Sequence, residues 1–279
     1  MGMQIRASFR KEFLAFFRTK RFLVIALFYI GWSILGPLFI RGIGGMMDSL
    51  SPVYDEYGMD VSKMTEALGS AVSLGVASTI AQLSQLGLIV FLIQINSAAG
   101  GEQKKRAIII PRSAGLRSFA YIFPKYIIYP LTALVLAVAG AFVSYGISLA
   151  LFDKNDVYSG GILFAGLLTG VSLMFYVCAH LTLGTATSRS GMSSAVCIIA
   201  SLMLPGLFAA LGSSEIYNPF TLTLLAGSVI YRETPADIVP VDIISTVIIA
   251  VGIMLILFFI ALFVQNAKKI DNSGNEITI

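Results

Sequence analysis

Six long stretches without a charged residue dominate the sequence. Each is between 19 and 33 residues long, and a helix needs about 20 apolar residues to cross the hydrocarbon core of a bilayer. The short segments of alternating polarity that are typical of membrane β-barrels do not occur in the sequence. The pattern therefore predicts an all-α integral membrane protein with six transmembrane helices. They are expected within residues 22–40, 67–99, 126–152, 157–188, 190–214 and 243–267.

Composition agrees with this prediction. Of the 279 residues, 57% are hydrophobic and 12% are charged, whereas soluble domains average about 45–50% and about 25%. So few charges cannot cover the surface of a water-soluble domain. The first stretch, residues 22–40, is longer than the roughly 7–15 apolar residues of a signal peptide, so we expect it to be a retained span.

The distribution of charge predicts the orientation. If the N-terminus is cytoplasmic, 15 of the 19 Lys and Arg residues lie on the inner side, and 11 of the 15 acidic residues lie on the outer side. Basic residues are enriched in the cytoplasmic loops of membrane proteins. An even number of spans keeps this asymmetry, so we expect both termini in the cytoplasm.

Three segments outside the spans have distinct patterns, and we expect all of them within a single transmembrane domain, residues 1–279. Residues 4–20 predict a basic amphipathic helix in the inner interface. Residues 100–125 form a basic cytoplasmic loop that is long enough to contain a short helix. Residues 213–242 contain an apolar run, 220–230, that is too short to cross the bilayer, so we expect a re-entrant segment on the outer side. The apolar residues of the first segment recur at near-helical spacing: Ile5, Phe9, Phe13, Phe16 and Phe17.

Catalytic and metal-binding chemistry has little support in the sequence. No Asp, Glu, Lys or Arg lies deep within a predicted span, although proton- and ion-coupled transporters usually place such groups there. His180, in the fourth span, has no acidic partner, and it is either a hydrogen-bonding residue between helices or a proton relay. Cys178 and Cys197 lie in apolar stretches without metal-ligand spacing, so we expect free thiols. The sequence lacks a P-loop and a nucleophile elbow, so we expect no enzyme activity and no cofactor on this chain. It also lacks the basic pattern of a nucleic-acid-binding protein.

Uncharged polar residues gather in the second span. At 100° per residue, Gln82, Gln85 and Asn96 fall within about 60° of one another on one helix face. Amides are costly against lipid, so this face should contact either a neighbouring helix or a translocation pathway. Both alternatives remain open from the sequence.

A cytoplasmic motif follows the second span. The chain reads Gly101-Glu102-Gln103-Lys104-Lys105-Arg106 and continues to Pro111-Arg112-Ser113. Together with the amphipathic first segment and the apolar run after Asn218-Pro219, this resembles the six-span permease subunit of type-2 ABC exporters, which have the type V exporter fold. In that family a glutamate followed by basic residues contacts the ATPase, which implies a coupling role for Glu102, Gln103, Lys104, Lys105 and Arg106. The sequence departs from the family at 107–110, where Ala-Ile-Ile-Ile replaces the usual Gly-Thr-Leu.

The resemblance implies an assembly. Two permease subunits, identical or different, would form the translocation pathway, and two separate ABC ATPase subunits would bind ATP and Mg²⁺. The expected location is the plasma membrane, in particular a bacterial cytoplasmic membrane. Two other classes remain as alternatives. One is an ATP-independent secondary transporter or channel that uses the Gln/Asn face, and the other is an intramembrane enzyme or assembly factor that uses His180.

Overall fold

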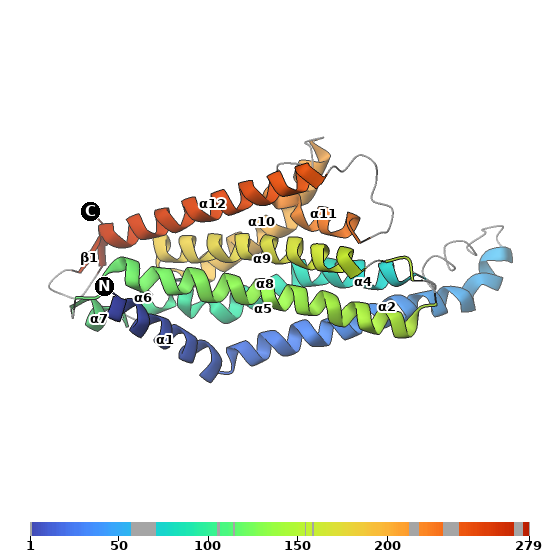
Figure 1. Ribbon diagram of the computed structural model, residues 1–279, viewed down its shortest axis with the longest axis horizontal. Coiled ribbons are helices and arrows are strands. Elements are labelled where there is room, and N and C mark those ends of the chain that lie inside the picture. Colours follow the sequence, from blue (N-terminus) through green and yellow to red (C-terminus); the bar gives the residue numbers. More distant parts are fainter. Residues whose placement is uncertain are drawn as a thin grey trace.

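The computed structural model describes residues 2–56, 71–104, 107–113, 115–153, 155–157, 159–211, 218–230, 240–270 and 276–278. These residues are predominantly helical (Figure 1). The helices are α1 (Gly2–Arg18), α2 (Arg21–Glu56), α4 (Val72–Gln82), α5 (Leu88–Ile95), α6 (Glu102–Lys104), α7 (Ile109–Ser113), α8 (Ser118–Leu151), α9 (Ser159–Thr187), α10 (Ser190–Ala210), α11 (Leu222–Ser228) and α12 (Pro240–Ala267). Two π-helical segments, η1 (Leu83–Gly87) and η2 (Ser97–Gly101), flank α5, and a 3-10 turn, η3 (Pro219–Thr221), precedes α11.

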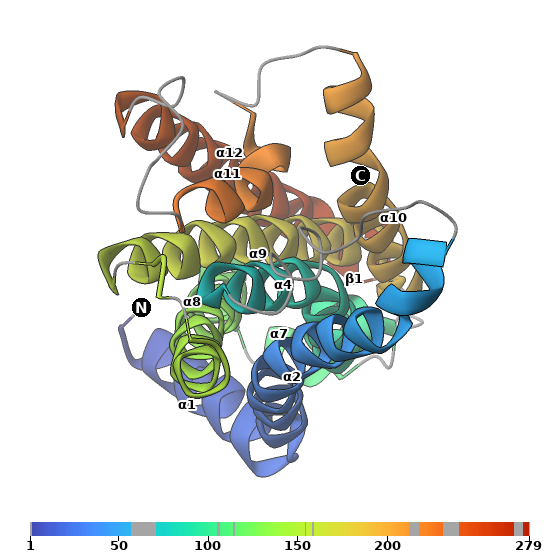
Figure 2. The same ribbon diagram turned by 90° about the vertical axis from the view of Figure 1, so that its right-hand side faces the viewer.

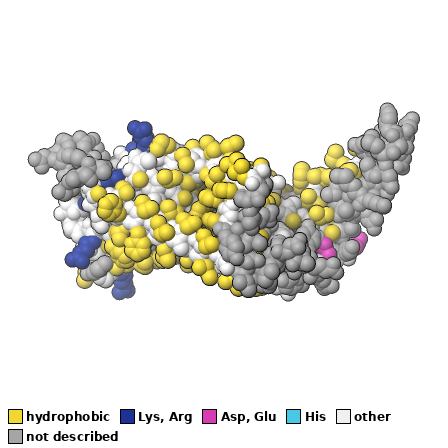
Figure 3. All heavy atoms as spheres, turned by 90° about the horizontal axis from the view of Figure 1, so that it is seen from above, with side chains coloured by type: hydrophobic (Ala, Val, Ile, Leu, Met, Phe, Trp, Pro, Cys, Tyr) yellow, Lys and Arg dark blue, Asp and Glu magenta, His cyan; other side chains and the backbone are white. Residues whose placement is uncertain are grey.

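Six helices are long and apolar enough to cross a membrane, at the positions that the sequence predicts. They are α2, the continuous helix α4–η1–α5, α8, α9, α10 and α12. The length and composition of these helices are thus those of a multi-pass membrane protein. Hydrophobic side chains cover the middle of the molecule, and Lys and Arg side chains gather at one end (Figure 3).

Helix α9 forms the centre of the bundle. In its most apolar window 67% of the residues are buried, against 17% for α12 and 22% for α10. It lies between α11 and α12 on one side and α4 and α8 on the other (Figure 2). Small residues permit this central position: the Cβ of an alanine at Gly170 would lie 3.0 Å from the Cα of Leu134 in α8. The outward face of α12 carries exposed Ile248, Leu255 and Phe263, as expected for a helix in contact with lipid.

The start of α1 and the end of α12 lie at the same end of the bundle, where α6 and α7 are also found (Figure 1). We call this the terminal end. Here a short antiparallel pair of strands, β1 (Lys268–Ile270) and β2 (Glu276–Thr278), follows α12. This pair is a small departure from the predicted all-α fold.

Three spans differ from prediction in detail. The first was expected within residues 22–40, but α2 continues past residue 40 to Glu56 and contains Arg41. The third spanning helix begins at Ser118 rather than near residue 126, so Lys125 lies inside this helix. The charge-free criterion placed Lys125 in the loop because it assumed that a cation ends a span. The second span contains the π-helical segment η1, which has more residues per turn than an α-helix and so changes which residues share a face.

The segment between α10 and α12 is described in part. Asn218 accepts a hydrogen bond from the backbone N–H of Phe220 through its side chain at 3.0 Å, which caps η3 and α11. Leu222, Leu225 and Ala226 of α11 are buried, and α11 packs against α9. The apolar run at 220–230 therefore forms a short helix against the bundle, and the remainder of residues 213–242 lies largely outside the described residues.

Candidate functional site

Four charged side chains meet at the terminal end of the bundle, and we call them the charge cluster: Lys11 and Glu12 of α1, Glu102 of α6 and Lys125 of α8. Lys125 is 2% exposed. Its ammonium group donates hydrogen bonds to Glu102 Oε2 at 2.7 Å, the Tyr121 hydroxyl at 2.8 Å and the Ala98 carbonyl at 3.0 Å. An ammonium group has three donors, so every proton of this buried cation has a partner.

Helix α1 contributes a buried acid and an exposed base to the cluster. Glu12 is 3% exposed, and its Oε2 accepts a hydrogen bond from the Tyr129 hydroxyl at 3.0 Å. Its Oε1 lies 3.5 Å from Lys11 Nζ and 3.9 Å from Lys125 Nζ. Lys11 extends to Glu102 Oε1 at 2.8 Å. The two acids and two bases therefore neutralise one another across three helices.

Glu102 is held in its charged form. Burial disfavours the ionised carboxyl, but the positive charges of Lys125 and Lys11 and their hydrogen bonds outweigh burial and lower the pKa of Glu102 to about 2. Tyr121 also donates a hydrogen bond to its Oε2 at 2.9 Å. At neutral pH Glu102 is thus a carboxylate that joins α6 to α1 and α8.

Gln103, the next residue, attaches α6 to the opposite side of the bundle. Its amide nitrogen donates to Gln265 Oε1 in α12 at 2.6 Å, and its oxygen accepts from Ser188 Oγ at 2.9 Å and Lys268 Nζ at 3.1 Å. Lys268 also donates to the Thr185 carbonyl of α9 at 2.6 Å. Two consecutive side chains of α6 therefore bind α1 and α8 on one side, and the ends of α9 and α12 on the other.

The chain reaches α6 through a tight backbone contact. In η2, Gly100 has φ of +120°, a conformation that strongly favours glycine. Gly100 lies against Gly184 of α9. A Cβ added at Gly184 would be 1.5 Å from the carbonyl oxygen of Ala99. Only glycine permits this approach, so α9 and η2, which leads directly into α6, are in backbone contact.

The remaining predicted coupling residues differ in their placement. Lys104 is exposed at the terminal end and lines an open hollow together with Ser188, Arg189 and neighbouring residues. Lys105 and Arg106 lie outside the described residues. Of the predicted coupling residues that the structure describes, Glu102 and Gln103 are thus bound within the bundle and Lys104 faces outward.

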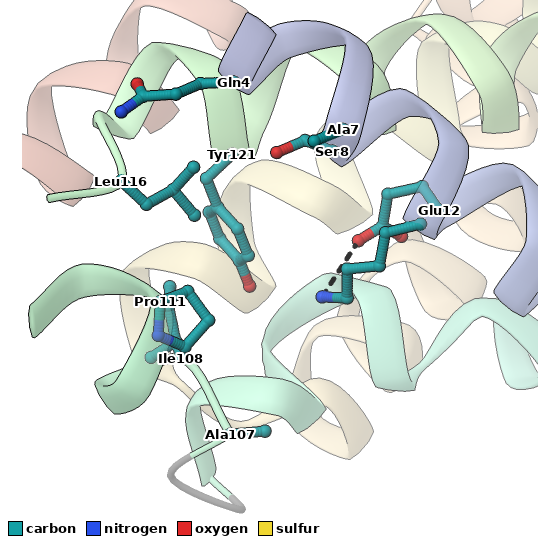
Figure 4. A pocket seen from close by; sticks show the side chains of 10 residues that line it. Gln4, Ala7, Ser8, Glu12, Ala107, Ile108, Pro111, Leu116 and Tyr121 are labelled. Atoms are coloured by element: carbon teal, nitrogen blue, oxygen red, sulfur yellow. Dashed lines mark ion pairs between the residues drawn. The ribbon is translucent and has the colours of Figure 1, made fainter. Parts of the chain in front are cut away.

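A cavity of about 390 Å³ adjoins the charge cluster. Helix α1 forms one wall through Gln4, Ser8 and Glu12, and the segment after α6 forms the other through Ile108 and Pro111 (Figure 4). The close-up shows the ion pair of Glu12 at the edge of this cavity. The cavity lies between α1 and the segment that contains α7, and Gln4 of α1 donates a hydrogen bond to the carbonyl of Gly115, just after α7, at 3.1 Å.

The structure does not bring the three amides of the second span to a single surface. Asn96 accepts a hydrogen bond from Ser194 Oγ of α10. Gln85 lines a cavity beside α10, whereas Gln82 lines a different cavity beside α2. The prediction of one shared face assumed 100° per residue throughout, and the π-helical segment η1 changes that phase.

His180 and the two cysteines are buried in the bundle. His180 Nδ1 lies 2.6 Å from Ser193 Oγ of α10, and its Nε2 has no hydrogen-bond partner within the described residues. Cys178 and Cys197 are unpaired and buried. No group of three or more His, Cys, Asp or Glu side chains suited to a metal ion occurs within the described ranges.

Glu12 is the residue of the candidate site that sequence reasoning missed. It is the sole acidic residue before Asp48, and its spacing from Phe9 and Phe16 places it on the apolar face of the amphipathic helix. An acid on an apolar face is the signal of a buried ion pair. The charge-free pattern predicts a loop at its partner Lys125, so the sequence alone does not reveal the pair.

Comparison of the chain with models of known protein families, with curated proteins and with solved structures gives no match.

Proposed function

We propose that this chain is the membrane-spanning subunit of an ATP-driven exporter of the type-2 ABC class. Two such subunits, identical or different, would form the pathway, and two separate ATPase subunits would bind ATP and Mg²⁺. In this proposal the terminal end faces the cytoplasm of a bacterial cell, and α11 is the re-entrant segment on the outer side.

The connection of α6 to four helices carries this proposal. A three-residue turn at the terminal end of the bundle is joined to α1 and α8 by Glu102 and to α12 by Gln103. Gln103 also reaches the end of α9 through Ser188 and Lys268. A force applied to α6 would therefore act on several spanning helices at once. Packed cores and interfaces switch between discrete arrangements rather than deforming continuously, so such a turn suits an element driven by an external motor.

The residues of α6 divide the work of docking and transmission in this proposal. Lys104 is exposed and would touch the ATPase, together with Lys105 and Arg106. Glu102 and Gln103 would pass the movement to the spanning helices. Replacing a docking residue should weaken binding of the ATPase, whereas replacing a transmitting residue should reduce transport by an intact complex. The two roles can therefore be separated by experiment.

The test is co-purification with a candidate ABC ATPase from the same organism, followed by transport assays in proteoliposomes. We expect Lys104→Glu to weaken the complex by reversing an exposed charge. Gln103→Leu should leave the complex intact and reduce transport relative to ATP hydrolysis. If no ATPase co-purifies, and vesicles containing the chain alone transport solute down an ion gradient, the chain is a secondary transporter and the proposal is wrong.

A further inference from the structure

A second cavity, of about 300 Å³, lies within the spanning region between η1, α9, α10 and α11. This volume is at the lower end of the range for small-molecule pockets. None of its lining residues is charged. Its polar lining residues come from four elements: Ser84, Gln85, Ser172, Tyr176, Ser201 and Thr223.

A buried hydroxyl without a partner lies in the wall of this cavity. Tyr176 is 5% exposed, and its hydroxyl has no hydrogen-bond partner within the described residues. Buried polar groups in native proteins are almost always hydrogen-bonded, and each exception requires an explanation. A bound molecule that offers an acceptor would satisfy this hydroxyl.

Two helices that form the cavity are also distorted at it. Pro205 lies inside α10, and since proline has no N–H, the carbonyl of Ser201 one turn earlier loses its helical donor. Both residues line the cavity. On the facing side, Ser84 and Gln85 belong to the π-helical segment η1, a geometry that is frequent at functional sites. The wall therefore offers a hydroxyl donor and an amide, beside a backbone carbonyl that Pro205 cannot pair with.

The remaining wall is apolar. Leu202, Phe220 and Leu224 line the cavity beside these polar groups, and Phe220 is held by ring contacts with Phe175 at 5.4 Å and Phe208 at 5.5 Å. An ion would be desolvated here without an opposite charge, which is costly. An uncharged molecule with both a hydrogen-bonding group and an apolar body matches both kinds of surface.

We infer that this cavity is a binding site for uncharged amphipathic molecules that carry a hydroxyl or carbonyl group, with the Tyr176 hydroxyl as the hydrogen-bond donor to them. The inference goes beyond the proposed exporter function, and it is independent of any ATPase because the cavity is formed by this chain alone.

The experiment uses the full chain purified in nanodiscs and an octanol that carries a photoactivatable diazirine. After irradiation, mass spectrometry identifies the labelled peptides. We expect concentration-dependent labelling of the peptides around residues 172–176 and 201–206. Octanoate and octyltrimethylammonium with the same diazirine are the charged counterparts, and they should label these peptides far more weakly.

The decisive variant is Tyr176→Phe, which removes the hydroxyl and keeps the ring. The concentration for half-maximal labelling should rise about three- to tenfold, the loss expected for one neutral hydrogen bond. Tyr29→Phe is the matched control, because Tyr29 of α2 is also buried and its hydroxyl also lacks a partner within the described residues, yet it does not line this cavity. Its labelling should equal that of the unmodified chain.

A steric variant provides an independent test. An added Cβ at Gly206 would meet no atom within 4 Å, so Gly206→Leu should fold and should fill part of the cavity. We expect its labelling to fall. The inference is wrong if the charged probes label these peptides as well as the octanol does, if Tyr176→Phe and Tyr29→Phe behave alike, or if Gly206→Leu is labelled normally. Competition by dioctanoylglycerol would identify a lipid as the natural occupant, and competition by octanol alone would indicate a smaller neutral compound.

Discussion

Replacement of Lys125 by methionine should destabilise the bundle severely. Lys125 is 2% exposed, Glu12 is 3% exposed, and their cluster is neutral as it stands. The Lys125→Met variant keeps the volume of the side chain but leaves two carboxylates with one ammonium group. Removal of one partner from a buried ion pair costs about 3–5 kcal/mol. We expect a loss of that size in the free energy of unfolding.

Lys11→Met is the matched control, since it removes the other cation of the same cluster. The Lys11 side chain is 54% exposed, and exposed ion pairs contribute about 0.2–1 kcal/mol. Equilibrium unfolding in dodecyl maltoside micelles titrated with sodium dodecyl sulfate, followed by circular dichroism, measures both variants under one condition. The two losses should differ by several-fold although each variant removes one positive charge.

The double variant Lys125→Met/Glu102→Gln completes the comparison. Removing a negative charge together with the positive one should restore part of the stability, with a coupling of about 1–3 kcal/mol between the two sites. If Lys125→Met costs about 1 kcal/mol or less, or if the double variant is as unstable as the sum of the single ones, the charges are solvated and the cluster does not hold the three helices together.

Three further predictions concern other parts of the terminal end and the topology. Because the pKa of Glu102 is lowered from 4.5 to about 2, its contribution to stability is complete above about pH 4.5 and is lost as the pH falls toward 2. In Glu102→Gln the free energy of unfolding, plotted against pH, should therefore be flatter over that window. A plot that is the same as that of the unmodified chain would contradict the ion pairing. Gly184→Ala should prevent close packing of α9 and lower the melting temperature, whereas Gly191→Ala, with no atom within 4 Å of the added Cβ, should not; equal melting temperatures would contradict the contact. A single cysteine at Ser51 should react with an impermeant thiol reagent in intact cells and one at Ser113 should not, and the reverse result would invert the proposed orientation.

The number and position of the spanning helices followed from the sequence because lipid requires long apolar segments, and such segments are visible without any knowledge of packing. The amphipathic helix at the N-terminus was predictable because its apolar residues recur at near-helical spacing. Residues 4–20 predicted it, and α1 spans Gly2–Arg18. Both kinds of feature depend on the local sequence alone.

The charge cluster was not predictable in the same way. Lys125 was assigned to a loop because a charge inside a spanning helix is costly, and the structure meets that cost with partners from two distant segments, Glu12 and Glu102. The relation between Gln82 and Gln85 failed for a different reason. A π-helical turn has no clear signature in the residues of η1, so the assumed helical phase could not be corrected from the sequence.

The internal neutrality of the charge cluster has a consequence for the surface of the molecule. Lys11 and Lys125 are balanced by Glu12 and Glu102, so these four residues add little to the electrostatic potential outside the bundle. The positive field at the terminal end arises instead from exposed side chains that have no role in the cluster: Arg6, Arg10, Lys104, Arg117 and Arg189. Anionic lipid headgroups or an acidic protein surface would respond to this second set. Attraction to a partner and cohesion of the helices thus depend on separate residues. Salt should weaken the attraction, which comes from exposed charges, and leave the cohesion of the buried cluster nearly unchanged.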